Sequence, residues 1–502
     1  MKKRAVLALD MGTSSVRAGI FDSTGNLIED SLVDSPYRVD TSSPGQVSSD
    51  ANFLSDLVDR TIDQTLARAN ASGLEISAVG TSCYWHSLIG TAKDGKPTTE
   101  VLTWADTRSA EDAEQLRSQG DEQAYHERTG CFFHASYWPA KLRWLSRSRA
   151  HDFSRTSRWV SLAEYLYSRF FGEAPVSHSI ASGTGLLDPR SGQWDPGSLQ
   201  LAQVTEEQLP TVSDWTDSLS GLQPSYASRW PVLKDVPWYL GLGDGGLSNV
   251  GAGCVKSDAF CVMVGTSGAL RVLIPHELRI PWGCFAYRLD MSHWVLGGAL
   301  SEGGNVIDWL AASFHLDSKT VIESAVSEAD ADGHGLTVLP FWAGERSPNW
   351  RAHVRATIAG LSLGTTPLQI VRAVVEAISY QFATVFETML ASVARPSLLV
   401  ASGGRLLHSP AWMQMLADVL GMPVMMSPVR EASARGAALL ALHQLGERAQ
   451  LWEEGPGEGR TFQPRESSHG RYLEARRRQR ELYELLLPDA ARQLSSFSDG
   501  GR

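Results

Sequence analysis

Residues 5–21, which read AVLALDMGTSSVRAGIF, share a pattern with residues 259–274, which read AFCVMVGTSGALRVLI. Each stretch has an apolar run rich in β-forming residues, a small-residue turn built on Gly-Thr-Ser, and a second apolar run. This order predicts a hairpin with a tight turn. Each unit opens about half of the chain, so the repeat predicts two related lobes. We place the lobes at residues 1–247 and 248–502, with the junction near residues 244–256.

The Gly-Thr-Ser turns suit a phosphate group, because glycine and small hydroxyl residues expose backbone N–H groups with little side-chain bulk. The two copies differ at one position. Asp10 precedes the first turn, whereas Met263 holds the matching place before the second. An acidic side chain at the end of a buried strand beside a phosphate can bind Mg²⁺ through water. The alternative is that Asp10 only accepts hydrogen bonds from the turn amides.

The size and charge of the chain limit its class. A chain of 502 residues exceeds what one hydrophobic core usually supports. The formal net charge of −11 argues against general binding to nucleic acid or to an anionic membrane. The cysteines are scattered without a CxxC pair, as in a reducing compartment, and no stretch reaches the roughly 20 apolar residues of a membrane span. We therefore expect a cytoplasmic protein with a small-molecule substrate.

Helical periodicity covers much of the remaining chain. A turn at residues 23–26 predicts a third strand over residues 27–29, and Ser49 or Asp50 is the expected N-cap of the first long helix. We expect residues 452–471 to form a surface loop and residues 495–502 a frayed tail. The pattern predicts helices over residues 48–69, 370–390, 410–420, 431–445 and 471–487.

Residues 241–246, Gly-Leu-Gly-Asp-Gly-Gly, match the GxGxxG dinucleotide fingerprint, but a single match is weak. The match lies in the middle of the chain, outside an early β-α-β unit, and no acidic residue follows at the expected distance. The other interpretation is that these glycines clear space around Asp244. An aspartate that a substrate can approach suits the general base for a hydroxyl in phosphoryl transfer.

Taken in order, these motifs resemble those of the FGGY family of carbohydrate kinases, within the actin/hexokinase/Hsp70-like superfamily. The resemblance covers nearly the whole chain. It rests on residues 9–15, 80–87, 103–108, 241–246, 264–267, 301–304, 340–348 and 402–404.

The resemblance implies an α/β fold of two ribonuclease-H-like lobes, with ATP and a sugar in a central cleft. It implies that Asp244 is the catalytic base and that Asp10 holds Mg²⁺. The sugar hydroxyls would be bound by Trp85, His86 and Asp106. The nucleotide would be bound by Thr13, Ser14, Gly265 and Thr266 at its phosphates, and by Gly304, Asp308, Gly403, Gly404 and His408 at its adenosine.

The resemblance also bears on the substrate. The Trp85–His86 pair resembles the gluconate and xylulose kinase branches, whereas glycerol kinases carry Arg-Glu there. Residues 243–246 and 344–350 are most similar to gluconate kinases, although residues 355–360 depart from that branch. We therefore expect gluconate or a related aldonic acid, with a ketopentose (xylulose or ribulose) as the alternative. A carboxylate needs a cationic donor, and Arg346 and Lys141 are the candidates.

Other interpretations stay open at this point. Trp85 and His86 can be core residues, and Asp106 can form a structural ion pair with Arg108. For the whole chain, the alternatives are a nicotinamide oxidoreductase and a non-catalytic sugar-binding relative. The second would be expected to have lost Asp10 or Asp244, and both are present. The oligomeric state is undetermined, and a homodimer is among the options.

Overall fold

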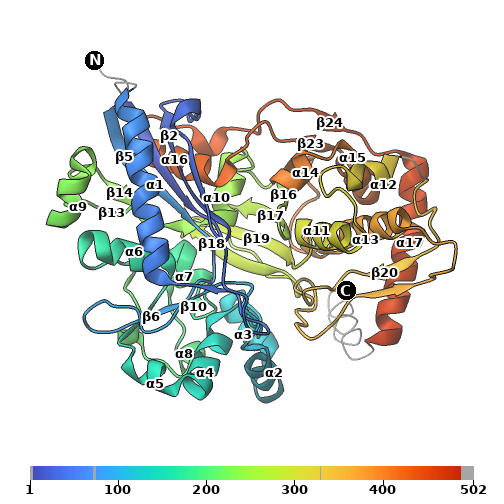
Figure 1. Cartoon of the computed structure of the whole chain (residues 1–502), viewed down its shortest axis with the longest axis horizontal. Coiled ribbons are helices and arrows are strands. Elements are labelled where there is room, and N and C mark those ends of the chain that lie inside the picture. The colour runs from blue at the N-terminus through green and yellow to red at the C-terminus, as the bar shows by residue number, and fades with distance from the viewer. Residues whose placement is uncertain (1–3, 72–74, 328–329, 488–502) are drawn as a thin grey trace.

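The computed structural model describes residues 4–71, 75–327 and 330–487 and consists of two lobes that lie side by side (Figure 1). Each lobe is built on a seven-stranded sheet. The N-terminal sheet has the order β13-β14-β5-β1-β2-β3, with β15 also paired to β5, and the C-terminal sheet has the order β18-β19-β17-β16-β22-β23-β24. One large cluster of buried apolar side chains lies mainly in the N-terminal lobe and extends to β17, β18 and β19, and a second lies in the C-terminal lobe. The predicted division into two related lobes is therefore visible in the sheets.

The two sheets start in the same way. β1 (Arg4–Met11) pairs antiparallel with β2 (Ser15–Asp22) and parallel with β5 (Glu75–Cys83). β16 (Ala259–Val264) likewise pairs antiparallel with β17 (Gly268–Ile274) and parallel with β22 (Leu398–Ser402). The remaining strands of the two sheets are β3 (Val33–Pro36), β13 (Ser218–Leu219), β14 (Trp238–Tyr239), β15 (Leu242–Gly243), β18 (Phe285–Asp290), β19 (His293–Leu300), β23 (Val424–Met426) and β24 (Thr461–Phe462).

The long predicted helices are present. α1 (Ala51–Ala71) follows Asp50, whose Oδ1 accepts a hydrogen bond from the Phe53 N–H at 2.7 Å, so Asp50 is the N-cap. The helices predicted over residues 370–390, 410–420 and 431–445 correspond to α13 (Pro367–Met389), α15 (Pro410–Leu420) and α16 (Ala432–Gln444). The structure also contains α2 (Ala110–Gln119), α3 (Glu122–Thr129), α4 (Trp138–Ser148), α6 (Leu162–Phe171), α7 (His178–Ser182), α10 (Asp244–Gly251), α11 (Gly304–Ser313) and α14 (Gly404–Leu407).

Two predicted segments differ from the structure. Leu27 makes only an isolated bridge to Phe21, and the third strand is β3, reached through a short 3₁₀ helix at Glu29–Ser31. The segment at residues 452–471 is not wholly loop, because β24 pairs with β23 and α17 (Glu466–Leu486) begins five residues earlier than expected. A long-range contact anchors this start, since Asp418 accepts hydrogen bonds from the backbone and guanidinium of Arg465. The predicted tail at residues 495–502 lies outside the described residues.

Helix α16 comes late in the chain but lies on the N-terminal sheet (Figure 1). Its alanines pack against Val6, Ala8 and Ala78 of that sheet. A Cβ at Gly80 would lie 2.4 Å from the carbonyl oxygen of Ala437, so close packing requires glycine there. A helix from the C-terminal half of the chain thus packs against both β1 and β5. No helix among the described residues is long and apolar enough to cross a membrane.

Candidate active site

A cleft of about 870 Å³ lies where the two Gly-Thr-Ser turns face each other. Residues from both lobes and from α16 line it. Of the predicted site residues, the cleft brings together Asp10, Ser14, Asp244, Gly265, Thr266, Gly403, Gly404 and His408. Motifs separated by hundreds of residues therefore meet in one place, as the predicted central cleft requires.

Asp10 fits a metal ion. The side chain is buried, and its Oδ1 atom has no hydrogen-bond partner. Burial raises the pKa of Asp10 to about 6, and the nearby charge of Asp244 adds to this rise. Arg17 is the cation that pairs with Asp10, and its Nη1 lies 3.9 Å from Oδ2 of Asp10. An orphaned carboxylate oxygen at a phosphate-sized turn is a suitable oxygen ligand for Mg²⁺, directly or through water.

Asp244 is the first residue of α10, and the Gly245 N–H donates to its Oδ1 at 2.7 Å. Burial raises the pKa of its carboxyl group above the ordinary value, while the positive charge of Arg271 lowers it. The glycines were expected to clear space for a substrate, but at Gly243 and Gly245 they make room for protein side chains. A Cβ at Gly243 would lie 1.9 Å from the Trp85 ring, and one at Gly245 would lie 2.6 Å from the Arg271 Nε.

The residues predicted to contact the nucleotide are partly in the cleft and partly behind it. Gly403 has φ 87°, and a Cβ there would lie 2.5 Å from the Val264 carbonyl oxygen. Gly304 donates its N–H to the Gly265 carbonyl at 2.8 Å, behind the second turn. Asp308 pairs with Arg405, and neither Asp308 nor Gly304 lines the cleft. Thr13 is also outside the lining, where its hydroxyl accepts a hydrogen bond from the Trp104 indole at 3.3 Å.

Trp85 and His86 are both buried, and the Trp85 ring packs against Gly245. The Trp85 indole N–H donates to the Ser179 carbonyl at 2.9 Å, so a sugar could use only the ring surface. The His86 Nδ1 donates to the Gly183 carbonyl at 2.5 Å, and burial holds the pKa of His86 well below its usual range. His86 is therefore neutral, and its Nε2 carries a lone pair that can accept a hydrogen bond from a hydroxyl.

Asp106 is buried in an ion pair. Its Oδ2 accepts from the Arg108 Nη2 at 2.7 Å and from the Val47 N–H at 3.0 Å, and its Oδ1 accepts from the Arg108 Nε at 3.0 Å. This geometry is that of the structural ion pair considered as the alternative to sugar binding. In this conformation its acceptors are directed to the protein.

The two predicted carboxylate partners differ in environment. Lys141 is buried, its Nζ donates to the His86 carbonyl at 2.7 Å, and burial lowers its pKa to about 7. Arg346 places its guanidinium 5.0 Å from the centre of the Trp104 ring, and its Nε is buried without a hydrogen-bond partner. Of the two candidate partners, Arg346 is the one with a buried N–H group, at Nε, that has no hydrogen-bond acceptor.

Sequence reasoning missed three charged residues of this region. Arg17 bridges Asp10 and Glu431, at 3.9 and 3.5 Å respectively, and both Arg17 and Glu431 line the cleft. Arg271 lies on β17 next to Gly245. The sequence does contain a sign of Arg271. It is the single charged residue in the second apolar run of residues 259–274.

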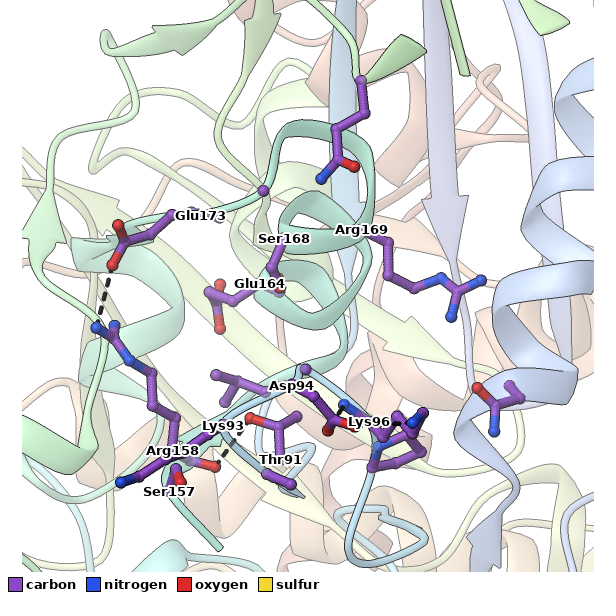
Figure 2. Close-up of a pocket in the computed structure, with 18 of the residues that line it drawn as sticks. Thr91, Lys93, Asp94, Lys96, Ser157, Arg158, Glu164, Ser168, Arg169 and Glu173 are labelled. Atoms are coloured by element: carbon purple, nitrogen blue, oxygen red, sulfur yellow. Dashed lines mark hydrogen bonds and ion pairs between the residues drawn. The ribbon is translucent and has the colours of Figure 1, made fainter. Parts of the chain in front are cut away.

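A second cavity, of about 1000 Å³, lies in the N-terminal lobe (Figure 2). Its charged side chains largely pair with each other, as Arg158 does with Glu173 at 3.1 Å and Lys96 with Asp94 at 2.8 Å. None of the predicted site residues lines it. The cleft between the turns is therefore the candidate active site, although it is the smaller of the two.

Two lobes that present matching Gly-Thr-Ser turns to one cleft are the arrangement expected of a two-lobed kinase, and the family models give the class. The N-terminal domain model of the FGGY family of carbohydrate kinases matches residues 5–251, and its C-terminal domain model matches residues 260–445. The chain belongs to the FGGY family of carbohydrate kinases. This confirms the predicted fold and enzyme class and excludes the nicotinamide oxidoreductase.

The relatives include more than one branch of the family. A gluconokinase of Bacillus subtilis is 28% identical over 455 residues, which cover 88% of each chain. A gluconate kinase of Lactobacillus acidophilus superposes with a TM-score of 0.89 at 26% identity, covering 97% of this chain and 98% of the other. A xylulose kinase of the same organism superposes with a TM-score of 0.88 at 26% identity, covering 96% and 98%.

Proposed function

We propose that this carbohydrate kinase transfers the γ-phosphoryl group of ATP to a hydroxyl of gluconate or a closely related aldonic acid. Asp244 accepts the proton of the attacking hydroxyl. The new P–O bond forms as the bond from the γ-phosphorus to the bridging oxygen breaks, and ADP leaves. The backbone N–H groups of the two Gly-Thr-Ser turns stabilise the charge on the transferring group.

Asp10 holds Mg²⁺ in this proposal. The bound ion supplies positive charge to the phosphate oxygens. The unpartnered Oδ1 of Asp10 supports this assignment. The chain's other contributions are to orient and to enclose: His86 accepts from a sugar hydroxyl through Nε2, and Trp85 supports the sugar with its ring. Ser14 and Thr266 bind phosphates, and Gly403, Gly404 and His408 surround the adenosine. The predicted contacts of Thr13, Gly304 and Asp308 would lie at the edge of the cleft, because none of the three lines it.

One observation supports an acidic substrate over a neutral one. Arg346 has a buried Nε without a hydrogen-bond partner, and no carboxylate of the described residues lies within 4.0 Å of it, although Glu302 is near enough to act on its charge. A buried guanidinium without a direct partner is costly, and a substrate carboxylate would supply that partner. A ketopentose such as xylulose or ribulose would leave the Nε–H group without a charged acceptor. The presence of both Asp10 and Asp244 in the cleft argues against a non-catalytic sugar-binding relative.

The cysteines support a reducing compartment. All five, at positions 83, 131, 254, 261 and 284, are buried thiols without a disulfide. This is the usual state of cysteine in a cytoplasmic enzyme, which is the location we propose.

The proposal is tested by measuring ADP release with a panel of gluconate, other aldonic acids, xylulose, ribulose and glycerol at fixed ATP and Mg²⁺. We expect the highest kcat/KM for gluconate or another aldonic acid. A clearly higher kcat/KM for a ketopentose would overturn the substrate assignment while leaving the family unchanged.

A further inference from the structure

Arg271 is a buried cation whose donors are unused. It lies on β17 between Cys261 of β16 and Gly297 of β19, and 8% of its surface is exposed. Its Nε and Nη1 atoms are buried without a hydrogen-bond partner. Nearly all buried polar groups in folded proteins are hydrogen-bonded, and an unpaired buried charge is costly. The sheet alone does not explain an arginine here.

The guanidinium of Arg271 lies beside the proposed base. A Cβ at Gly245 would be 2.6 Å from Nε and 2.7 Å from Cζ of Arg271, so the cation packs directly on the residue after Asp244. Arg271 is also the cation that most favours the ionised form of Asp244. The two side chains nevertheless form no ion pair within 4.0 Å. A donor and an acceptor therefore lie on either side of Gly245 in sequence and packing without bonding to each other.

A sugar hydroxyl can occupy such an arrangement, because it donates one hydrogen bond and accepts up to two. Its proton would point to Asp244 and its lone pairs to Arg271. Arg346 lies over the ring of Trp104 and is close enough to Arg271 and Asp244 to act on their charges. Of the two arginines, Arg271 has the larger effect on Asp244 and packs on Gly245, the residue next to it.

We propose that Arg271 is a substrate-contacting residue, whose guanidinium donates to oxygens at the reacting end of the sugar chain, while Arg346 binds the carboxylate. This inference rests on the proposed function and deepens it, because it assigns the two cations to different groups of the substrate. It requires Arg271 for acidic and neutral substrates alike, and Arg346 for acidic substrates only.

The test compares Arg271→Met with Arg288→Met. Arg288 is a matched control, since it is also a buried arginine of the C-terminal sheet, but its Nε donates to the Pro189 carbonyl at 2.6 Å and its Nη1 to the Met291 carbonyl at 3.1 Å. We expect Arg271→Met to keep or raise Tm, because it removes an uncompensated charge, and Arg288→Met to lower Tm, because it breaks satisfied hydrogen bonds. We expect kcat/KM to fall about 10- to 100-fold in Arg271→Met and to stay within about 3-fold in Arg288→Met.

The substrate dependence separates the two arginines. Gluconate is compared with D-glucitol, which has a CH₂OH group in place of the carboxylate, by turnover or, where turnover is absent, by competitive inhibition. Arg271→Met should weaken both ligands by a similar factor, and Arg346→Met should weaken gluconate alone.

Three results would overturn the inference: a Tm of Arg271→Met as low as that of Arg288→Met, a kcat/KM for gluconate within about 3-fold of wild type in Arg271→Met, or a loss confined to gluconate. Failure of the proposed function is distinguishable, because it would appear in the wild-type substrate panel or as full activity of Asp244→Asn. The Arg271→Met binding comparison does not depend on either result.

Discussion

Asp10 and Met263 occupy the same place in the two lobes. Each is the penultimate residue of the strand that leads into a Gly-Thr-Ser turn. Asp10 pairs in parallel register with Ser82 of β5, and Met263 pairs in parallel register with Ser402 of β22. Because the second hairpin forms with a methionine at this place, the hairpin itself does not require an acid. Asp10 is therefore expected to serve chemistry more than folding.

The first prediction follows from this equivalence. Asp10→Ala should fold with an unchanged circular dichroism spectrum and lose Mg²⁺-dependent turnover by at least ~100-fold, as expected for loss of charge stabilisation at a phosphoryl group. Activity is measured over a Mg²⁺ titration, with Asp10→Asn as the control that keeps the size of the side chain. An unfolded Asp10→Ala protein would show instead that Asp10 is structural.

The second prediction concerns the substrate carboxylate. Arg346→Met should raise KM for gluconate by ~10-fold or more and hardly change KM for a neutral polyol, because a hydrogen bond to a charged group contributes roughly 1.5–3 kcal/mol. Lys141→Met is the comparison. Lys141 donates to the His86 carbonyl, so its loss should affect acidic and neutral sugars to a similar degree. The opposite pattern, with the acid-specific loss in Lys141→Met, would identify Lys141 as the carboxylate partner.

The features predicted well from the sequence were those with local causes. The two hairpins follow from apolar runs around a small-residue turn, and the start of α1 follows from Asp50 three residues before Phe53. Gly446, with φ 77°, lies just beyond the end of α16, as its position after the periodic residues predicted. Such signals lie within a few residues of each other and are readable without the fold.

The features that were missed depend on distant partners. The start of α17 depends on Asp418, which accepts from Arg465 across 47 residues. The glycines around Asp244 were expected to leave space for a substrate. In the structure, the side chains of Trp85 and Arg271 pack against Gly245. Asp106 illustrates the same limit, since its motif was compatible with sugar binding and with an ion pair. Only the fold shows that Arg108 and the Val47 N–H occupy its carboxylate oxygens.

The third prediction is a pH dependence. Burial raises the pKa of Asp244 above the ordinary 3.8 and raises that of Asp10 to about 6. The carboxylate is the active form in both roles, so activity is lost as pH falls through the raised pKa values. At saturating Mg²⁺ and ATP, the acidic limb of kcat/KM for the sugar should therefore report Asp244, with its midpoint above the ordinary aspartate value. A profile that stays flat down to the ordinary aspartate range would contradict this.

The same profile in Arg271→Met provides a further check on that assignment. Removing the positive charge beside Asp244 should raise the pKa of that carboxyl group and move the acidic limb to higher pH. Arg288→Met should leave the limb in place.

The central claim is that Asp244 takes the proton from the hydroxyl that is phosphorylated. The most direct measurement is single-turnover phosphoryl transfer to gluconate by Asp244→Asn, combined with calorimetric titration of gluconate into the same protein. Asparagine keeps the shape of the side chain but cannot accept the proton. We predict that the rate of transfer falls by at least ~100-fold while gluconate binds within about 3-fold of wild type. Transfer at a rate close to that of the wild-type enzyme would contradict the account.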